Sequence, residues 1–146
     1  MFAPGSPIAS GEINSACFAG SSRLIVASNP EKGDLGDDDP KTLRSGHLGT
    51  WNLNTMQFDH LSPYNEIAGT MMAVGPDHIV SFFKHPKIVE LGTGKIIHRW
   101  PAIDSGAQSS CLLMDQANLP PPIALDPTNR RFAIAADREI TVIEIV

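Results

Sequence analysis

WNLNTMQF at residues 51–58 is followed, 38 residues later, by VELGTGKI at residues 89–96. In both stretches an extended run ends on Leu, turns through Thr, and resumes with a polar residue followed by an apolar one. Two such runs joined by a short turn predict an antiparallel pair of strands. The strand part returns once more at residues 142–145. The sequence therefore predicts a repeated unit that is built from strands.

A second repeated pattern lies upstream of each of these stretches. Apolar runs interrupted by a turn occur at residues 17–26, 72–80 and 123–134. Each unit thus contains two inner strands, a connection, and one or two outer strands. Four-stranded units that recur with variable connections are typical of propeller blades. The expected blade units span about residues 13–62, 67–101 and 122–146.

The fold class expected from these patterns is all-β. It would contain about three antiparallel four-stranded propeller-like blades, the last incomplete, within a single domain at residues 13–146 that follows an N-terminal arm at residues 1–12. The alternative is a β-sandwich, because strands at regular spacing suit both architectures. Gly or Pro interrupts almost every window long enough for an amphipathic helix, and the best exception is 111–119. Long loops are expected at 30–44 and 101–121.

The repeated motifs resemble those of a known superfamily. TWNLNTMQ (50–57) resembles the outer-strand motif of WD-repeat blades, in which an aromatic residue, an acidic or amide residue and Leu precede a Thr-Gly turn. VELGTGK (89–95) and IALDPTNRRFAIAADREITVIEI (123–145) are similar to YVTN and quinoprotein-type propellers. Asn52 and Glu90 stand where WD repeats usually have Asp, so the buried tetrad of that family is not assigned. The resemblance implies a β-propeller.

Three blades are fewer than the four to eight that typically close a propeller. An open arc leaves its end faces uncovered, and a single repeat cannot bury its own face. We therefore expect a homo-oligomer, most simply a dimer of six blades, or association with other propeller blades. The missing outer strand of the last unit would come from Met1–Ile8 of this chain or of a neighbour.

The composition argues against nucleic-acid binding, membrane binding and a membrane-spanning helix. Of the 146 residues, 18% are charged and 42% hydrophobic, and the net charge is -5. An acidic chain with scattered Lys and Arg lacks the basic patch that nucleic acid or an anionic membrane requires. No apolar stretch approaches the roughly 20 residues of a spanning helix. With two cysteines a disulfide framework is excluded, so a reduced, cytoplasmic setting is expected.

The expected contact points for a protein partner lie in the two long loops. The densest acidic cluster lies within G-D-L-G-D-D-D-P (33–40), whose order does not match a calcium loop, so a solvated acidic loop that favours a basic protein surface is expected. Trp100 borders the second loop, which contains a run of prolines. The candidate partner-binding residues are Asp34, Asp37, Asp38, Asp39, Trp100, Pro120 and Pro121.

No pattern points to catalysis, a metal or a cofactor. The chain has no G-x-S-x-G, and no pair among its five histidines has metal-site spacing, although His60 and His98 share the 38-residue offset. Cys17 lies in an apolar run, so we expect it to be a core residue. The expected function is a non-enzymatic protein–protein interaction scaffold that completes a ring by self-association.

Two alternatives to the scaffold remain open. The first is small-ligand binding, or an enzyme of the quinoprotein or lactonase type, in the central channel of the assembled propeller. It would require convergent polar groups at the channel mouth near Asn14, Ser15, Thr70 and Pro122, where too few residues are ionisable to support catalysis. The second is an inactive fragment of a longer propeller.

Overall fold

The computed structural model describes residues 13–28, 46–106 and 121–146. These residues form eleven strands and no helix. The strands are β1 (Ile13–Ala19), β2 (Arg23–Ser28), β3 (His47–Asn52), β4 (Gln57–Pro63), β5 (Met71–Val74), β6 (His78–Ser81), β7 (Lys87–Glu90), β8 (Ile96–Arg99), β9 (Ile123–Asp126), β10 (Arg131–Ala136) and β11 (Glu139–Glu144).

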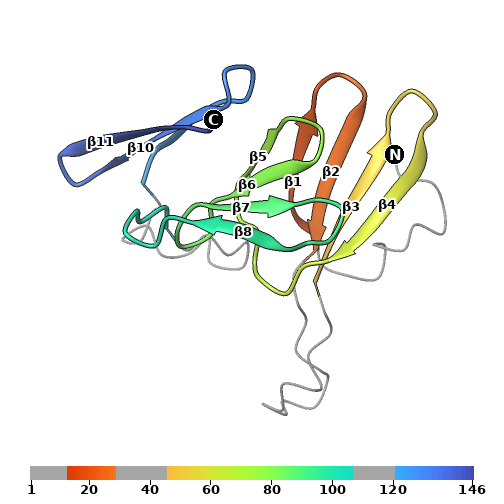
Figure 1. Cartoon of the computed structure of the whole chain (residues 1–146), viewed down its shortest axis with the longest axis horizontal. Helices are drawn as coiled ribbons and strands as arrows, with labels where there is room; N and C mark the ends of the chain where they lie inside the picture. The colour runs from red at the N-terminus through yellow and green to blue at the C-terminus, as the bar shows by residue number, and fades with distance from the viewer. Residues whose placement is uncertain (1–12, 29–45, 107–120) are drawn as a thin grey trace, which may run out of the picture.

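Three antiparallel sheets follow one another along the chain. The first sheet has the order β1-β2-β3-β4, the middle sheet β5-β6-β7-β8, and the third sheet β11-β10-β9. Each strand pairs with its neighbour in sequence, so every connection inside a sheet is a hairpin or a short loop between adjacent strands, except the long β2–β3 connection. The expected all-β class, with two complete four-stranded units and a last unit of three strands, is confirmed. Figure 1 shows the middle sheet lying between the other two.

The 38-residue repeat extends to the irregularities of the backbone. In the first sheet Thr50 pairs with His60 but Trp51 pairs with Phe58, which leaves one extra residue in β4. The middle sheet has the same register shift between Ile88 and Val89, at the equivalent position of β7 and β8. A bulge of this kind inserts one residue and increases the local twist. The two outer hairpins therefore share their distortion as well as their pattern.

The inner strands of the middle sheet are buried on both faces. Side chains alternate across a strand, so a strand that is covered on both sides needs an unbroken apolar run. Met71 and Ala73 of β5 pack into a core shared with the first sheet. Met72 and Val74 of the same strand pack into a second core, shared with the third sheet. The run Met71–Val74 is accordingly buried at every position.

The first core, between the first and middle sheets, is closed by polar contacts. The buried Tyr64 hydroxyl donates to Ser81 Oγ at 3.2 Å. Ser62 Oγ, at the end of β4, donates to the Leu91 carbonyl of the middle sheet. These bonds tie the β4–β5 connection to the sheet that follows it. The two sheets therefore pack in one defined arrangement.

The second core, between the middle and third sheets, is aromatic. The Phe82 and Phe132 rings meet edge to face with centroids 4.9 Å apart, and the Trp100 and Phe132 rings lie 5.9 Å apart. Phe82 and Phe132 are both almost fully buried. Because each buried ring removes a large apolar area from water, this cluster holds the third sheet against the middle one.

Candidate interaction surfaces

The face of the first sheet that points away from the middle sheet is apolar and aromatic. Phe18, Leu24, Trp51 and Phe58 stand opposite one another in register across all four strands. The Trp51 and Phe58 rings meet edge to face at 5.2 Å, and Trp51 is buried beside Val26. Phe18 is 67% exposed and Phe58 38% exposed. We call this surface the aromatic end face.

The face of the third sheet that points away from the middle sheet is also apolar, but its side chains are smaller. Ala124, Ala133 and Val142 stand opposite one another in register, and Ala135 pairs with Ile140 in the next row. Ile140 is 74% exposed and Val142 is 62% exposed. We call this surface the aliphatic end face. Both ends of the stack of sheets thus present apolar surface among the residues that the structure describes.

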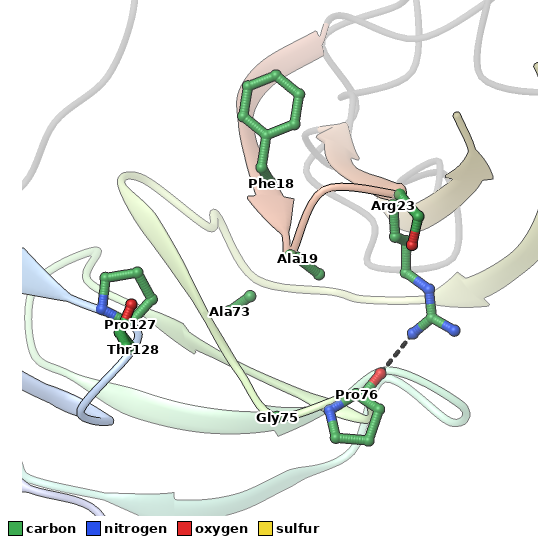
Figure 2. Close-up of a pocket in the computed structure, with 10 residues that line it drawn as sticks. Phe18, Ala19, Arg23, Ala73, Gly75, Pro76, Pro127 and Thr128 are labelled. Carbon is green, nitrogen blue, oxygen red and sulfur yellow. Dashed lines mark hydrogen bonds between the residues drawn. The ribbon is translucent and has the colours of Figure 1, made fainter. Parts of the chain in front are cut away.

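A hollow of about 610 Å³ opens where the first hairpin turns of the three sheets meet (Figure 2). The β1–β2 turn contributes Gly20, the β5–β6 turn Pro76, and the β9–β10 turn Pro127. Arg23 spans two of these turns, because its Nη1 donates to the Pro76 carbonyl (Figure 2). Ala19 and Ala73 also line the hollow. Among its lining residues Arg23 is the single ionisable side chain, so the hollow lacks the paired acid and base that hydrolysis needs.

An ion-pair cluster lies at the β4–β5 connection. Lys87 Nζ, almost fully buried, donates to Glu66 Oε2 at 2.7 Å, and the Arg99 guanidinium holds both oxygens of the same carboxylate. Burial alone would raise the pKa of Glu66, but the hydrogen bonds from Arg99 and Lys87 lower it to about 2. The carboxylate therefore remains ionised at neutral pH. It is fully engaged in joining the connection to β7 and β8, which is a structural role.

The residues proposed from the sequence for partner binding are distributed unevenly. Asp34, Asp37, Asp38, Asp39 and Pro120 lie outside the described residues. Pro121 is described and half-buried, next to the start of β9. Trp100 is half-buried and packs against the second core, with the His98 ring 4.5 Å from its own. The structure thus gives Trp100 a packing contact on one side and partial exposure on the other.

The two histidines of the repeat take equivalent places. His60 and His98 lie on β4 and β8, each immediately after the bulge of its strand. His60 Nε2 lies 3.0 Å from the Gly92 carbonyl of the middle sheet, whereas the His98 ring meets the Trp100 ring edge to face. Within residues 13–28, 46–106 and 121–146, no three His, Cys, Asp or Glu side chains gather as a metal site would require.

Cys17 lies on β1 at the edge of the first core. Burial raises the pKa of its thiol to about 11, although a backbone hydrogen bond from Ala73 acts in the opposite direction. A thiol needs a lowered pKa to act as a nucleophile near neutral pH. The environment of Cys17 is therefore that of a packing residue.

The aromatic and aliphatic end faces were not identified from the sequence as sites. Their signal was present as the alternation of apolar residues along β1 and β11, which indicates which side chains share a face but not whether another sheet covers it.

Comparisons of the chain with protein-family models, with curated proteins and with solved structures gave no match. In the described part of the chain, no helix has the length and apolar character needed to cross a bilayer.

Proposed function

We propose that the protein is a non-enzymatic protein–protein interaction scaffold of propeller-type sheets that completes its stack by self-association. One observation carries this proposal: the inner strands of the middle sheet are covered on both faces, whereas among the described residues each end sheet leaves an apolar face open. Exposed apolar patches of this kind mark interaction sites in soluble proteins. The first and third sheets cover the middle sheet with apolar side chains. An apolar sheet face is therefore the kind of surface that fits each open face.

The two end faces differ in a way that favours contact between them. The aromatic end face projects the rings of Phe18 and Phe58, while the aliphatic end face is centred on Ala124 and Ala133. Large side chains facing small ones interdigitate, as they do inside a close-packed core. Two copies of the chain carry two faces of each kind, so each aromatic end face can meet an aliphatic one. The resemblance of the repeats to WD and YVTN blades supports the same arrangement, because such blades pack face to face around a ring.

The residues around the hollow support binding rather than catalysis. Ala19, Ala73, Pro76 and Pro127 give it an apolar wall with Arg23 at its rim. A general base and a general acid must both lie within reach of a substrate, and this set of side chains supplies neither. A cytoplasmic setting, which the cysteine content favours, and a basic partner for the acidic loop complete the proposal.

The test is the mass of the chain in solution, measured by sedimentation equilibrium and native mass spectrometry. The end-face contact alone is expected to give a dimer at micromolar concentration. Phe18→Ser and Ala133→Arg, which alter one end face each, should raise the dissociation constant about tenfold or more, equivalent to about 1.4 kcal/mol. Ile97→Ser is the matched control, because it removes a half-exposed apolar side chain from the middle sheet. A stable monomer at these concentrations would overturn the proposal.

A further inference from the structure

β11 is the outermost strand of the third sheet, and its outer edge meets no other strand among the described residues; the segment Met1–Ile8, expected from the sequence to supply the missing strand, lies outside them. Its counterparts in the other sheets, β3 and β7, are each paired on that edge by a fourth strand. Figure 1 shows β11 at the margin of the molecule. An unpaired edge presents backbone donors and acceptors that can pair with another chain.

The register of β11 shows which backbone groups point outward. The Ile145 N–H donates to the Arg130 carbonyl at 2.8 Å, so Ile145 directs its backbone groups toward β10. Residues in an antiparallel pair alternate between inward and outward groups. Ile143 and Thr141 therefore bond to β10, whereas Ile140 and Val142 direct their N–H and C=O groups to the open edge.

The side chains of β11 favour pairing rather than oppose it. The strand reads Glu-Ile-Thr-Val-Ile-Glu, in which the four central residues are β-branched. Open edges in native proteins are usually protected by charged side chains, above all Lys, by Pro or by a bulge; β11 has no Lys, Pro or bulge, and its charges, Glu139 and Glu144, stand only at its two ends. Ile140 and Val142, whose backbone groups point outward, also carry exposed apolar side chains, 74% and 62% exposed.

The sequence around Thr141 is self-complementary when the strand is paired with itself. An antiparallel pair with Thr141 opposite Thr141 of a second copy places Ile140 opposite Val142. It also places the exposed Arg138, at the β10–β11 turn, opposite the exposed Glu144. A register shifted by one residue would instead place Glu139 opposite Glu144, whose like charges repel. It would also place core-facing side chains of one sheet beside open-side side chains of the other.

We propose that β11 pairs antiparallel with β11 of a second copy of this chain, with Thr141 at the two-fold axis and Arg138 opposite Glu144 on both sides. Ile140 and Val142 of the two copies then exchange backbone hydrogen bonds. This contact goes beyond the proposed function, because it uses a sheet edge rather than an end face. Since it is two-fold symmetric, each edge takes one copy, so this contact alone gives a dimer, and together with the end-face contact it joins end-face dimers into larger assemblies.

Charges on the open side of the third sheet match this register. Asp126, Arg131 and Glu144 stand opposite one another across β9, β10 and β11, and Arg131 Nε donates to Asp126 Oδ2 at 2.8 Å. Arg138 of the second copy would extend this row with a further positive charge beside Glu144. The row then alternates in sign across the joined sheet, and cross-strand pairs of opposite charge stabilise such sheets.

The test is a charge reversal with its compensating partner, made in the full chain and measured by sedimentation equilibrium. Arg138→Glu places like charges opposite each other twice in the symmetric pair, so we expect the dissociation constant of the edge contact to rise about tenfold. The double variant Arg138→Glu/Glu144→Arg should restore it. Lys95→Glu changes the net charge equally on an exposed turn of the middle sheet and is expected to have no effect.

A second variant tests the backbone pairing. Val142→Pro removes an outward-pointing N–H, which an edge strand tolerates, and should abolish the edge contact while the fold is retained by circular dichroism. All variants are measured in the wild-type and Phe18→Ser backgrounds, so that loss of the end-face contact is distinguished from loss of the edge contact. Association that is insensitive to both Arg138→Glu and Val142→Pro overturns the edge pairing and shows that another segment or the end faces alone mediate it. A monomer in every background overturns both proposals.

Discussion

Gly94 packs so tightly against Pro63 that a Cβ added to Gly94 would collide with the Pro63 carbonyl oxygen. Gly94 also has a positive φ of 70°, which a residue with a side chain rarely adopts. The close approach joins the last outer hairpin of the middle sheet to the end of β4. Tyr64, which follows Pro63, and Ile96, two residues after Gly94, both pack in the first core.

Substitution of Gly94 by Ala is therefore expected to lower the free energy of unfolding by about 3 kcal/mol, because it combines overpacking against backbone with an unfavourable φ. Gly92→Ala, two residues away, is the control: nothing lies near its Cβ position and its φ is ordinary. It should change stability by less than about 0.5 kcal/mol. Urea denaturation of the two variants measures the difference, and equal effects would contradict the close packing.

Met56 occupies the position equivalent to Gly94 in the first sheet and has a φ of 56°. A side chain in this left-handed conformation is strained, and its exposed position on the surface offers little packing in return. Met56→Gly is expected to raise the free energy of unfolding by about 0.5 kcal/mol, since relief of the strain exceeds the entropy cost of glycine. Thermal and urea unfolding measure this gain; a loss of stability would show that Met56 packs more than its exposure indicates.

The pH dependence of stability should reflect Glu66. Its pKa in the folded protein is about 2, against an ordinary value of 4.5. A carboxylate with a lowered pKa contributes stability that is fully present above its unfolded pKa and is lost as the pH falls toward the folded one. The stability difference between the wild-type protein and Glu66→Gln should therefore be constant above about pH 5 and disappear toward pH 2.

Glu66→Gln also leaves Lys87 buried without its counter-charge, and we expect it to cost about 2 kcal/mol at neutral pH. Replacing the lysine as well, in Glu66→Gln/Lys87→Met, should recover most of that loss because no buried charge remains. If the double variant is as unstable as the single one, the cost does not arise from the unpaired lysine.

Phe132 should contribute more to stability than any neighbour in the third sheet. Its ring is buried against Phe82 and Trp100, so Phe132→Ala is expected to cost about 3–5 kcal/mol. Leu125 stands opposite Phe132 in register but is 40% exposed, and Leu125→Ala should cost about 1 kcal/mol. Near-UV circular dichroism and denaturation measure both; equal costs would mean that the third sheet does not dock through this ring.

Much of the fold could be predicted because its information is local. The repeat at residues 51–58 and 89–96 determined the outer hairpins, and the structure places strands β3 and β4, then β7 and β8, at these positions. The bulge shared by the two hairpins was not foreseen, although His60 and His98 already had the same offset.

The contacts that hold the sheets together could not be predicted. Glu66, Lys87 and Arg99 come from a loop and two strands, and no spacing rule connects residues that only packing brings together. Lys87, next to the apolar Ile88 and Val89, was the one available signal. The end faces escaped prediction for a different reason: alternation along a strand indicates that one side is apolar, but covering it depends on a neighbour elsewhere in the chain.

The covering of the middle sheet on both faces also bears on how the molecule opens. Separation of the first or the third sheet breaks one core and leaves the other intact, whereas opening of the middle sheet breaks both. Amide protons of β6 and β7 should consequently exchange with solvent slowest, and those of β10 and β11 faster, in proportion to the local free energy of opening. A partner seated on an end sheet would slow the exchange of that sheet first, and the pattern of protection along the chain would reveal which end it occupies.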